Sequence, residues 1–257
     1  MPYIKMTVQA GNDEYTYKYH THRYAKKSER GKNIKPTSKE QKKINKRIAQ
    51  RKRQWTASSN FNRGDWYITL TYRKSERPQD NKTASKILSD ILGKLRRKLK
   101  RNGIQLYYMS STERGEKGAV HHHLIIKNNF DIGMLIEQWT FGRIDTVSVY
   151  TDSMAELSEY FTKDISGKHA NKQAVKAKET IYSSSRNLKK PKITKQVIKA
   201  KTFTDVPINK KGCTIIHFYS GFQSEAGYLY QEYIQTKTKA QANAPFTCTQ
   251  KRLARKR

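Results

Sequence analysis

DWYITLTYR (65–73) is the stretch from which the fold of this chain can be worked out. Bulky β-forming side chains alternate with polar ones, as expected for a strand with one buried face. The next segment, 82–103, places Ile87, Ile91, Leu92, Leu95 and Leu99 at helical spacing and ends at Asn102-Gly103. This spacing predicts an amphipathic helix with a basic outer side.

Further elements follow the same logic. The segments IQLYYMSST (104–112) and AVHHHLIIKN (119–128) read as two strands joined by a polar, glycine-containing connection. A short helix, a strand and another helix are expected in 131–139, 143–150 and 153–165. The resulting order β-α-β-β-α-β-α predicts an α+β fold, an antiparallel sheet with helices on one face in a ferredoxin-like or split-βαβ arrangement.

Four regions are expected along the chain. Residues 1–54 hold 16 Lys or Arg against four acidic residues and form a basic N-terminal extension, either a solvated face or a DNA-contacting arm. Its segment 37–55 favours a helix capped by Ser38 or Thr37. A core domain is predicted for 55–200, a segment packing on that core for 201–236 and a disordered basic tail for 237–257.

The charge of the chain narrows its function. Lys and Arg total 53 against 21 Asp and Glu, a formal net charge of +32, which indicates a nucleic acid partner.

No stretch is apolar enough for a membrane span or a signal peptide, so we expect a cytoplasmic protein. The two cysteines support neither a disulfide framework nor a zinc site. The absence of a GxxxxGK[ST] loop excludes a fused ATP-driven helicase of that type.

Three consecutive histidines stand in the segment 119–128. Side chains two apart on a strand share a face, so His121 and His123 point together and His122 points to the opposite side. Two imidazoles at this spacing can bind one divalent metal. Glu113 ends the preceding strand and is either an oxygen ligand beside the pair or an exposed turn carboxylate. Such a site would suit Mg2+ or Mn2+ acting as a Lewis acid.

Tyr160 and Lys163 lie three residues apart in the expected helix 153–165 and so share a helical face. The lysine could favour the phenolate, and the phenolic oxygen could attack phosphorus to give a covalent phosphotyrosine. Because the chain has 16 tyrosines, the alternative is that Tyr160 serves in packing.

The order of ITLTY (68–72), HHH (121–123) and YFTK (160–163) resembles the three motifs of HUH endonucleases in their one-tyrosine form. Three landmarks resemble the rolling-circle replication proteins of plasmids, integrative elements and small single-stranded DNA phages: NFNRGD (60–65), TERG (112–115) and SSRNLKKP (184–191). His122 fills a position that is usually hydrophobic in this family. Asp164 follows Lys163, whereas several relatives carry a second tyrosine in this region, so resolving the intermediate would use another nucleophile or a second subunit.

The resemblance implies a metal held by His121, His123 and Glu113, with Tyr160 as the nucleophile and Lys163 as its helper. The enzyme would nick one strand at an origin, hold a 5′-phosphate, release a 3′-hydroxyl and later rejoin the ends. A host helicase and DNA polymerase would be partners, and a homodimer is possible. A relaxase or single-strand transposase would share this chemistry. The alternative from another class is a non-catalytic protein that binds single-stranded nucleic acid.

Six further residues are candidates for DNA contacts. Arg186 could bind a phosphate, and Asn187 could read a base edge or cap a turn. Thr69 and Thr71 could lie beside the metal, although threonines are common in strands for packing reasons. The neighbouring Lys189 and Lys190 complete the set.

Overall fold

The computed structural model describes residues 3–21, 38–115, 118–151, 153–154, 180–199, 203, 206–223 and 227–237. Its helices are α1 (Lys39–Asn60), α2 (Asn81–Arg101), α3 (Gly133–Ile136) and the short 3-10 helix η1 (Lys74–Glu76). The strands are β1 (Tyr3–Ala10), β2 (Asp13–His20), β3 (Trp66–Thr71), β4 (Tyr108–Arg114), β5 (Val120–Ile126), β6 (Ile144–Ser148), β7 (Ile181–Ser184), β8 (Lys192–Ile198), β9 (Cys213–Gln223) and β10 (Tyr228–Lys237).

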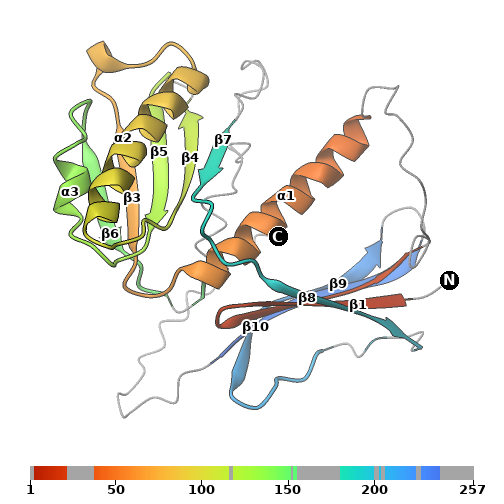
Figure 1. Ribbon diagram of the computed structural model, residues 1–257. Helices are drawn as coiled ribbons and strands as arrows, with labels where there is room; N and C mark the ends of the chain where they lie inside the picture. Colours follow the sequence, from red (N-terminus) through yellow and green to blue (C-terminus); the bar gives the residue numbers. More distant parts are fainter. Residues whose placement is uncertain are drawn as a thin grey trace, which may run out of the picture.

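Two antiparallel sheets of five strands contain these strands. The histidine sheet has the order β6-β3-β5-β4-β7, and the terminal sheet has the order β8-β1-β2-β10-β9. Figure 1 shows the histidine sheet at the left with α2 and α3 on its outer side, and the terminal sheet at the lower right. The predicted α+β class is confirmed, and the histidine sheet is compatible with an HUH endonuclease core.

The main core lies between α2 and the histidine sheet. Asp80 caps α2, its side chain accepting from the Thr83 amide at 2.7 Å, and the helix ends at Asn102 as predicted. The apolar stripe of α2 packs against alternate side chains of the central strands, and each fully buried aliphatic side chain contributes about 1.5–3 kcal/mol. The buried members from α2 are Ala84, Leu88, Ile91, Leu92, Leu95 and Leu99, and those from the strands include Ile68, Leu70, Leu124 and Ile126.

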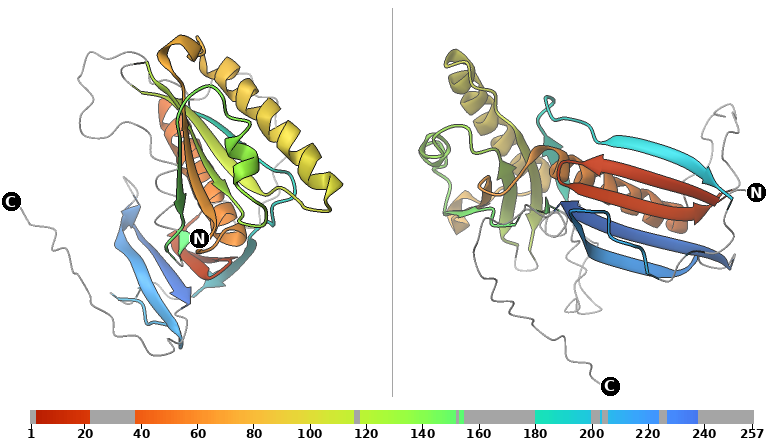
Figure 2. Two further views of the ribbon diagram at one scale, coloured as in Figure 1. Left: turned by 90° about the vertical axis from the view of Figure 1, so that its left-hand side faces the viewer. Right: turned by 90° about the horizontal axis from the view of Figure 1, so that it is seen from below.

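Helix α1 connects the two sheets (Figures 1 and 2). Ser38 caps it by accepting from the Gln41 amide at 3.1 Å, which confirms one of the two predicted caps. At its C-terminal end Ala57 and Phe61 pack on the face of the histidine sheet that α2 does not cover. Two residues before Ala57, Trp55 packs into the terminal sheet. A single helix therefore holds both sheets in place.

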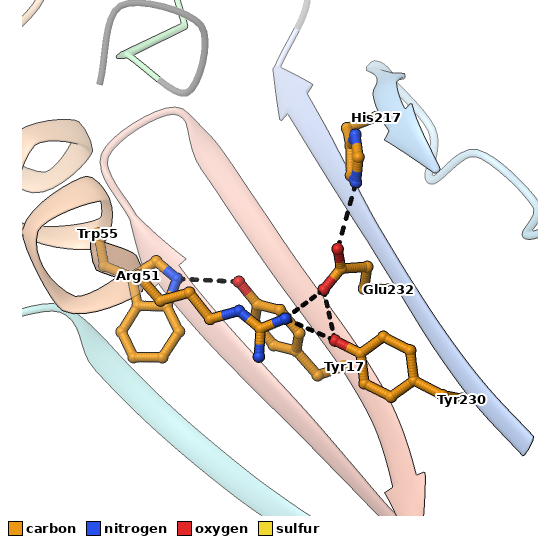
Figure 3. A network of polar contacts seen from close by, with 6 residues as sticks. All are labelled: Tyr17, Arg51, Trp55, His217, Tyr230 and Glu232. Atoms are coloured by element: carbon orange, nitrogen blue, oxygen red, sulfur yellow. Dashed lines mark hydrogen bonds and ion pairs between the residues drawn. The ribbon is translucent and has the colours of Figure 1, made fainter. Parts of the chain in front are cut away.

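Polar contacts fix α1 to the terminal sheet (Figure 3). Arg51 donates to the Tyr230 hydroxyl at 2.7 Å and forms an ion pair with Glu232 at 2.6 Å. Trp55 donates its indole N–H to the Tyr17 hydroxyl at 3.2 Å. The Arg51 guanidinium also lies over the Tyr17 ring, 4.6 Å from its centroid. These contacts join α1 to β2 and β10, far apart in sequence.

The turn between β1 and β2 approaches α1 closely. Gly11 has φ +60, and a Cβ added there would lie 2.0 Å from the Ser58 backbone oxygen. Only glycine fits this position, because both the backbone conformation and the available space exclude a side chain.

The terminal sheet unites the two ends of the described chain. Residues 3–20 supply β1 and β2, and residues 192–237 supply the other three strands. Tyr3 is in register with Ile198, and Thr16 with Tyr233. The predicted division into four regions stays a prediction. Of the expected tail, 237–257, Lys237 is the last residue of β10 and 238–257 lie outside the described residues.

Candidate active site

A row of five side chains crosses the histidine sheet on the face that α2 does not cover. Registered partners in neighbouring antiparallel strands share a face, so the pairing of the strands defines the row. From β7 to β6 it contains Tyr182, Ser111, His123, Thr69 and Asp145. The next row carries Glu113, His121 and Thr71. Both predicted histidines therefore lie at the centre of the sheet, flanked by polar residues.

His123 has polar partners at both ring nitrogens. Its Nε2 lies 2.9 Å from Glu113 Oε1, and its Nδ1 lies 3.0 Å from the Tyr67 hydroxyl and 3.3 Å from Thr69 Oγ1. A carboxylate can only accept a hydrogen bond, so Nε2 is the donor in this pair and Nδ1 of the neutral ring accepts. The ring is thus fixed between β3 and β4.

His121 stands beside this pair. Its ring centroid is 6.3 Å from that of His123, and the two planes are inclined by 19°. Burial lowers the pKa of His121, the neighbouring His123 and Arg77 lower it further, and Glu113 acts in the opposite direction. A neutral imidazole with an available lone pair is the form that binds a metal.

His122 points to the opposite side of the sheet and is fully buried. Its Nε2 lies 2.8 Å from the Tyr72 hydroxyl and its Nδ1 lies 2.8 Å from Thr112 Oγ1. Burial lowers its pKa to about 3, with smaller effects from His123 and His121. The middle histidine is thus a satisfied core residue, and the outer two share the open face.

The donor set has the chemistry of a metal site. When two ligand atoms each lie about 2.1 Å from a metal ion and their bonds to the ion form a right angle, the two atoms are about 3 Å apart. The Nε2–Oε1 distance of 2.9 Å between His123 and Glu113 has this value. Within the described ranges no group of three or more His, Cys, Asp or Glu side chains forms a cluster ready to hold a metal ion. His121 would have to turn toward the pair to complete one.

Sequence reasoning missed a second polar group at the edge of the site. Tyr182 of β7 occupies the histidine row, and the Arg53 guanidinium of α1 lies 3.5 Å from the centroid of its ring. Burial raises the pKa of Tyr182, Arg53 lowers it, and the nearby Glu113 raises it. Neither residue stands in a recognisable motif, because their proximity arises from the packing of α1 beside β7.

The candidate DNA contacts are placed as follows. Thr69 lies against His123, and Thr71 donates its hydroxyl to the Arg143 carbonyl at 3.2 Å. Arg186, Lys189 and Lys190 are exposed.

Two of these positions also have clear structural roles. The side chain of Asn187 donates to Gln105 and to the Leu106 carbonyl, both at 3.3 Å. Asn60 at the end of α1 accepts from the Lys189 amide at 2.7 Å and donates to the Lys189 carbonyl at 2.9 Å. The landmark SSRNLKKP (184–191), which follows the tyrosine motif, is therefore at least in part the structural crossing from β7 to β8.

Tyr160 and Lys163 lie outside the described residues. The described chain approaches that segment through Met154, which is 1% exposed and packs with Met109 and Ile125. Both of these partners occupy the histidine-bearing face, in the row next to His123. The chain becomes described again just before β7, at the edge of the same sheet.

None of the described helices is both long and apolar enough to cross a membrane. Searches among curated proteins and among solved structures found no match. A family model does match the chain, over the range that contains both histidines of the pair, Glu113, Tyr160 and Lys163. Residues 65–165 match the family Replication-associated protein ORF2/G2P, a rolling-circle replication initiator family, which confirms the predicted resemblance over this range and supports a replication-associated role.

Proposed function

We propose that the protein is a metal-dependent endonuclease and strand transferase of the HUH type that initiates rolling-circle DNA replication. The observation that carries the proposal is the His123–Glu113 pair at metal-ligand spacing on the sheet face that α2 does not cover, inside the range that matches the initiator family. His121, His123 and Glu113 would hold Mg2+ or Mn2+. The bound ion would supply Lewis-acid polarisation of the scissile phosphate.

Tyr67 would set the tautomer of His123. In the present arrangement Nε2 donates to Glu113, and Tyr67 donates to Nδ1 at 3.0 Å. For Nε2 to offer its lone pair to an ion, the proton must sit on Nδ1, where the Tyr67 and Thr69 oxygens can accept it. The residues around His123 can therefore satisfy either tautomer.

Tyr160 would be the nucleophile and Lys163 would stabilise its phenolate. In the step proposed, a bond forms between the phenolic oxygen and phosphorus, the bond from phosphorus to the 3′ oxygen breaks, and that oxygen takes up a proton. Tyr160 follows Met154 by six residues, a length of chain that spans at most about 21 Å, or about 9 Å when helical. Because Met154 packs on the face of the sheet that carries His121 and His123, this reach is compatible with attack at the metal site.

The remaining assignments are proposals of the same kind. Exposed Arg186, Lys189 and Lys190 would bind phosphates of the strand. A host helicase would open the duplex, and a host polymerase would extend the 3′-hydroxyl. The cytoplasmic location and the homodimer stay predictions.

The decisive experiment uses a pool of labelled circular single-stranded DNAs with a randomised segment, incubated with the protein and Mn2+ and separated on a denaturing gel. We expect linear DNA with protein attached to its 5′ end. Tyr160→Phe and the double variant His121→Ala, His123→Ala should abolish the product. Tyr150→Phe is the matched control, because Tyr150 is 79% exposed and belongs to neither polar row. Binding without cleavage in the wild type would instead favour the non-catalytic alternative.

A further inference from the structure

The N-terminal half of α1 is exposed on all sides. Every residue from 39 to 48 is exposed, although the second half of the same helix is packed between two sheets. In Figure 1 this half stands clear of both sheets, with its first turn farthest from the histidine sheet. Isolated helices of so few turns are only marginally stable in water, so this half depends on its continuity with the packed half.

Its charge is strongly positive. Residues 39–48 contain five Lys or Arg and a single Glu, and residues 49–53 add three more Lys or Arg. With 100° per residue, Lys39, Lys42, Lys43 and Lys46 fall on one side of the helix, and Arg53 continues that side two turns after Lys46. Arg53 is the residue that stacks on Tyr182 in the histidine row. A basic stripe therefore runs along α1 and ends at the candidate active site.

The opposite side carries two exposed isoleucines. Ile44 and Ile48 are 49% and 44% exposed and continue the stripe that, at Arg51 and Trp55, contacts the terminal sheet. Basic side chains of a helix can bind the phosphates that flank the major groove of DNA. A helix of about 10–12 Å diameter also fits that groove, which is about 12 Å wide.

We propose that residues 39–48 of α1 form a duplex DNA-binding element that enters the major groove beside the nicking site. The position of the nick relative to this element rests on the proposed function, whereas duplex binding itself does not. Lys39, Lys42 and Lys43 contact phosphates of the duplex, and Arg53 lies where the strand passes onto the histidine face. From Lys39 to Arg53 the helix rises about 21 Å, equal to about six base pairs.

The test measures binding of a blunt duplex and of a single strand of equal length by fluorescence anisotropy, over a series of salt concentrations. The variant Lys39→Gln, Lys42→Gln, Lys43→Gln removes three charges and keeps good helix formers. The control Lys94→Gln, Lys98→Gln, Lys100→Gln removes three exposed charges from α2, on the other side of the histidine sheet. Circular dichroism and light scattering verify helix content and mass.

Loss of three phosphate contacts should reduce the slope of log K against log salt by about 2.7 for the duplex. The α2 control should keep the wild-type slope, and single-strand affinity should change less than duplex affinity. Equal losses in both variants, or an unchanged slope in the α1 variant, would overturn the proposal. So would an equal loss for the single strand, or a change of mass that identifies the helix as a self-association surface.

Nicking of the circular single strands separates the two proposals. The α1 variant should nick these circles as the wild type does, because the substituted lysines lie outside the candidate active site. If the wild type binds duplex through α1 but never nicks, the duplex-binding element stands and the nuclease does not. Dimethyl sulfate footprinting on a hairpin, which probes guanine N7 in the major groove, should show protection centred within about six base pairs of the nick.

Discussion

The buried His122 should make the stability of the protein depend on pH in a way that one substitution removes. Its pKa is about 3 in the folded state, against an ordinary value of 6.5 in the unfolded chain. Below pH 6.5 the unfolded state therefore binds a proton that the folded state does not, and stability is lost as the pH falls. From pH 7 to pH 5 this single group costs about 2 kcal/mol of unfolding free energy.

The comparison is with His122→Leu, measured by urea unfolding with a chelator present at both pH values. At pH 7 the leucine leaves the buried hydroxyls of Tyr72 and Thr112 without their partner, at about 1–3 kcal/mol for each hydroxyl. We expect the variant to be clearly less stable at pH 7, and the gap to the wild type to narrow by about 2 kcal/mol at pH 5.

Taking the difference between wild type and variant cancels other titrating groups. Asp13, for example, has a pKa raised by burial, so its contribution changes in the opposite direction as the pH falls. An equal gap between the two proteins at pH 7 and pH 5 would show that His122 is not held neutral by its surroundings. The reasoning about the middle histidine would then be refuted.

Three further substitutions have defined outcomes. Gly11→Ala should destabilise the protein by more than about 2 kcal/mol in urea unfolding, because its Cβ would meet the Ser58 backbone oxygen at 2.0 Å; a shift under half of that would show that the turn simply moves. Asn60→Ala removes both side-chain hydrogen bonds to the β7–β8 crossing and should lower stability by about 2 kcal/mol, with an unchanged thermal midpoint as the contrary result. Tyr67→Phe should weaken Mn2+ binding about 10-fold in calorimetry. This is the lower end of the range for loss of an outer-shell partner, because Thr69 Oγ1 remains 3.3 Å from His123 Nδ1. An unaltered Mn2+ affinity would contradict the tautomer assignment.

Local patterns predicted four of the five strands of the histidine sheet, whereas no strand was expected where β7 lies. The alternation in β3, the helical stripe of α2 and the strand geometry around the histidines each depend on neighbours in sequence, so a short window contains the necessary information. The placement of Glu113 near the pair also followed, because β4 and β5 are adjacent strands joined by a short connection. Even the split between His122 and its neighbours was implied by the period of a strand.

Long-range pairing could not be predicted in the same way. DEYTYKYH, which forms β2, is rich in aromatic residues, but nothing in it indicates that Thr16 will face Tyr233. Arg53 and Tyr182 come together only because α1 packs beside β7. Tyr67 alternates with Ile68 and looks like an ordinary strand aromatic, so its contact with His123 Nδ1 emerges only from the register of β3 against β5.

The terminal sheet has a consequence for how the protein is made on the ribosome. Its strands β1 and β2 come from residues 3–20, but the strands that flank them come from residues 192–237, and Tyr3 pairs with Ile198. Closing a flexible loop of that length costs roughly 5 kcal/mol of chain entropy. The strands of the histidine sheet all lie between β2 and β8 in sequence. This sheet can therefore fold first and shorten the length of flexible chain that must be closed to pair β1 with β8. We therefore expect the β1–β2 hairpin to stay unpaired with its neighbouring strands until residues 192–237 have been synthesised, which makes completion of the terminal sheet a late step in folding.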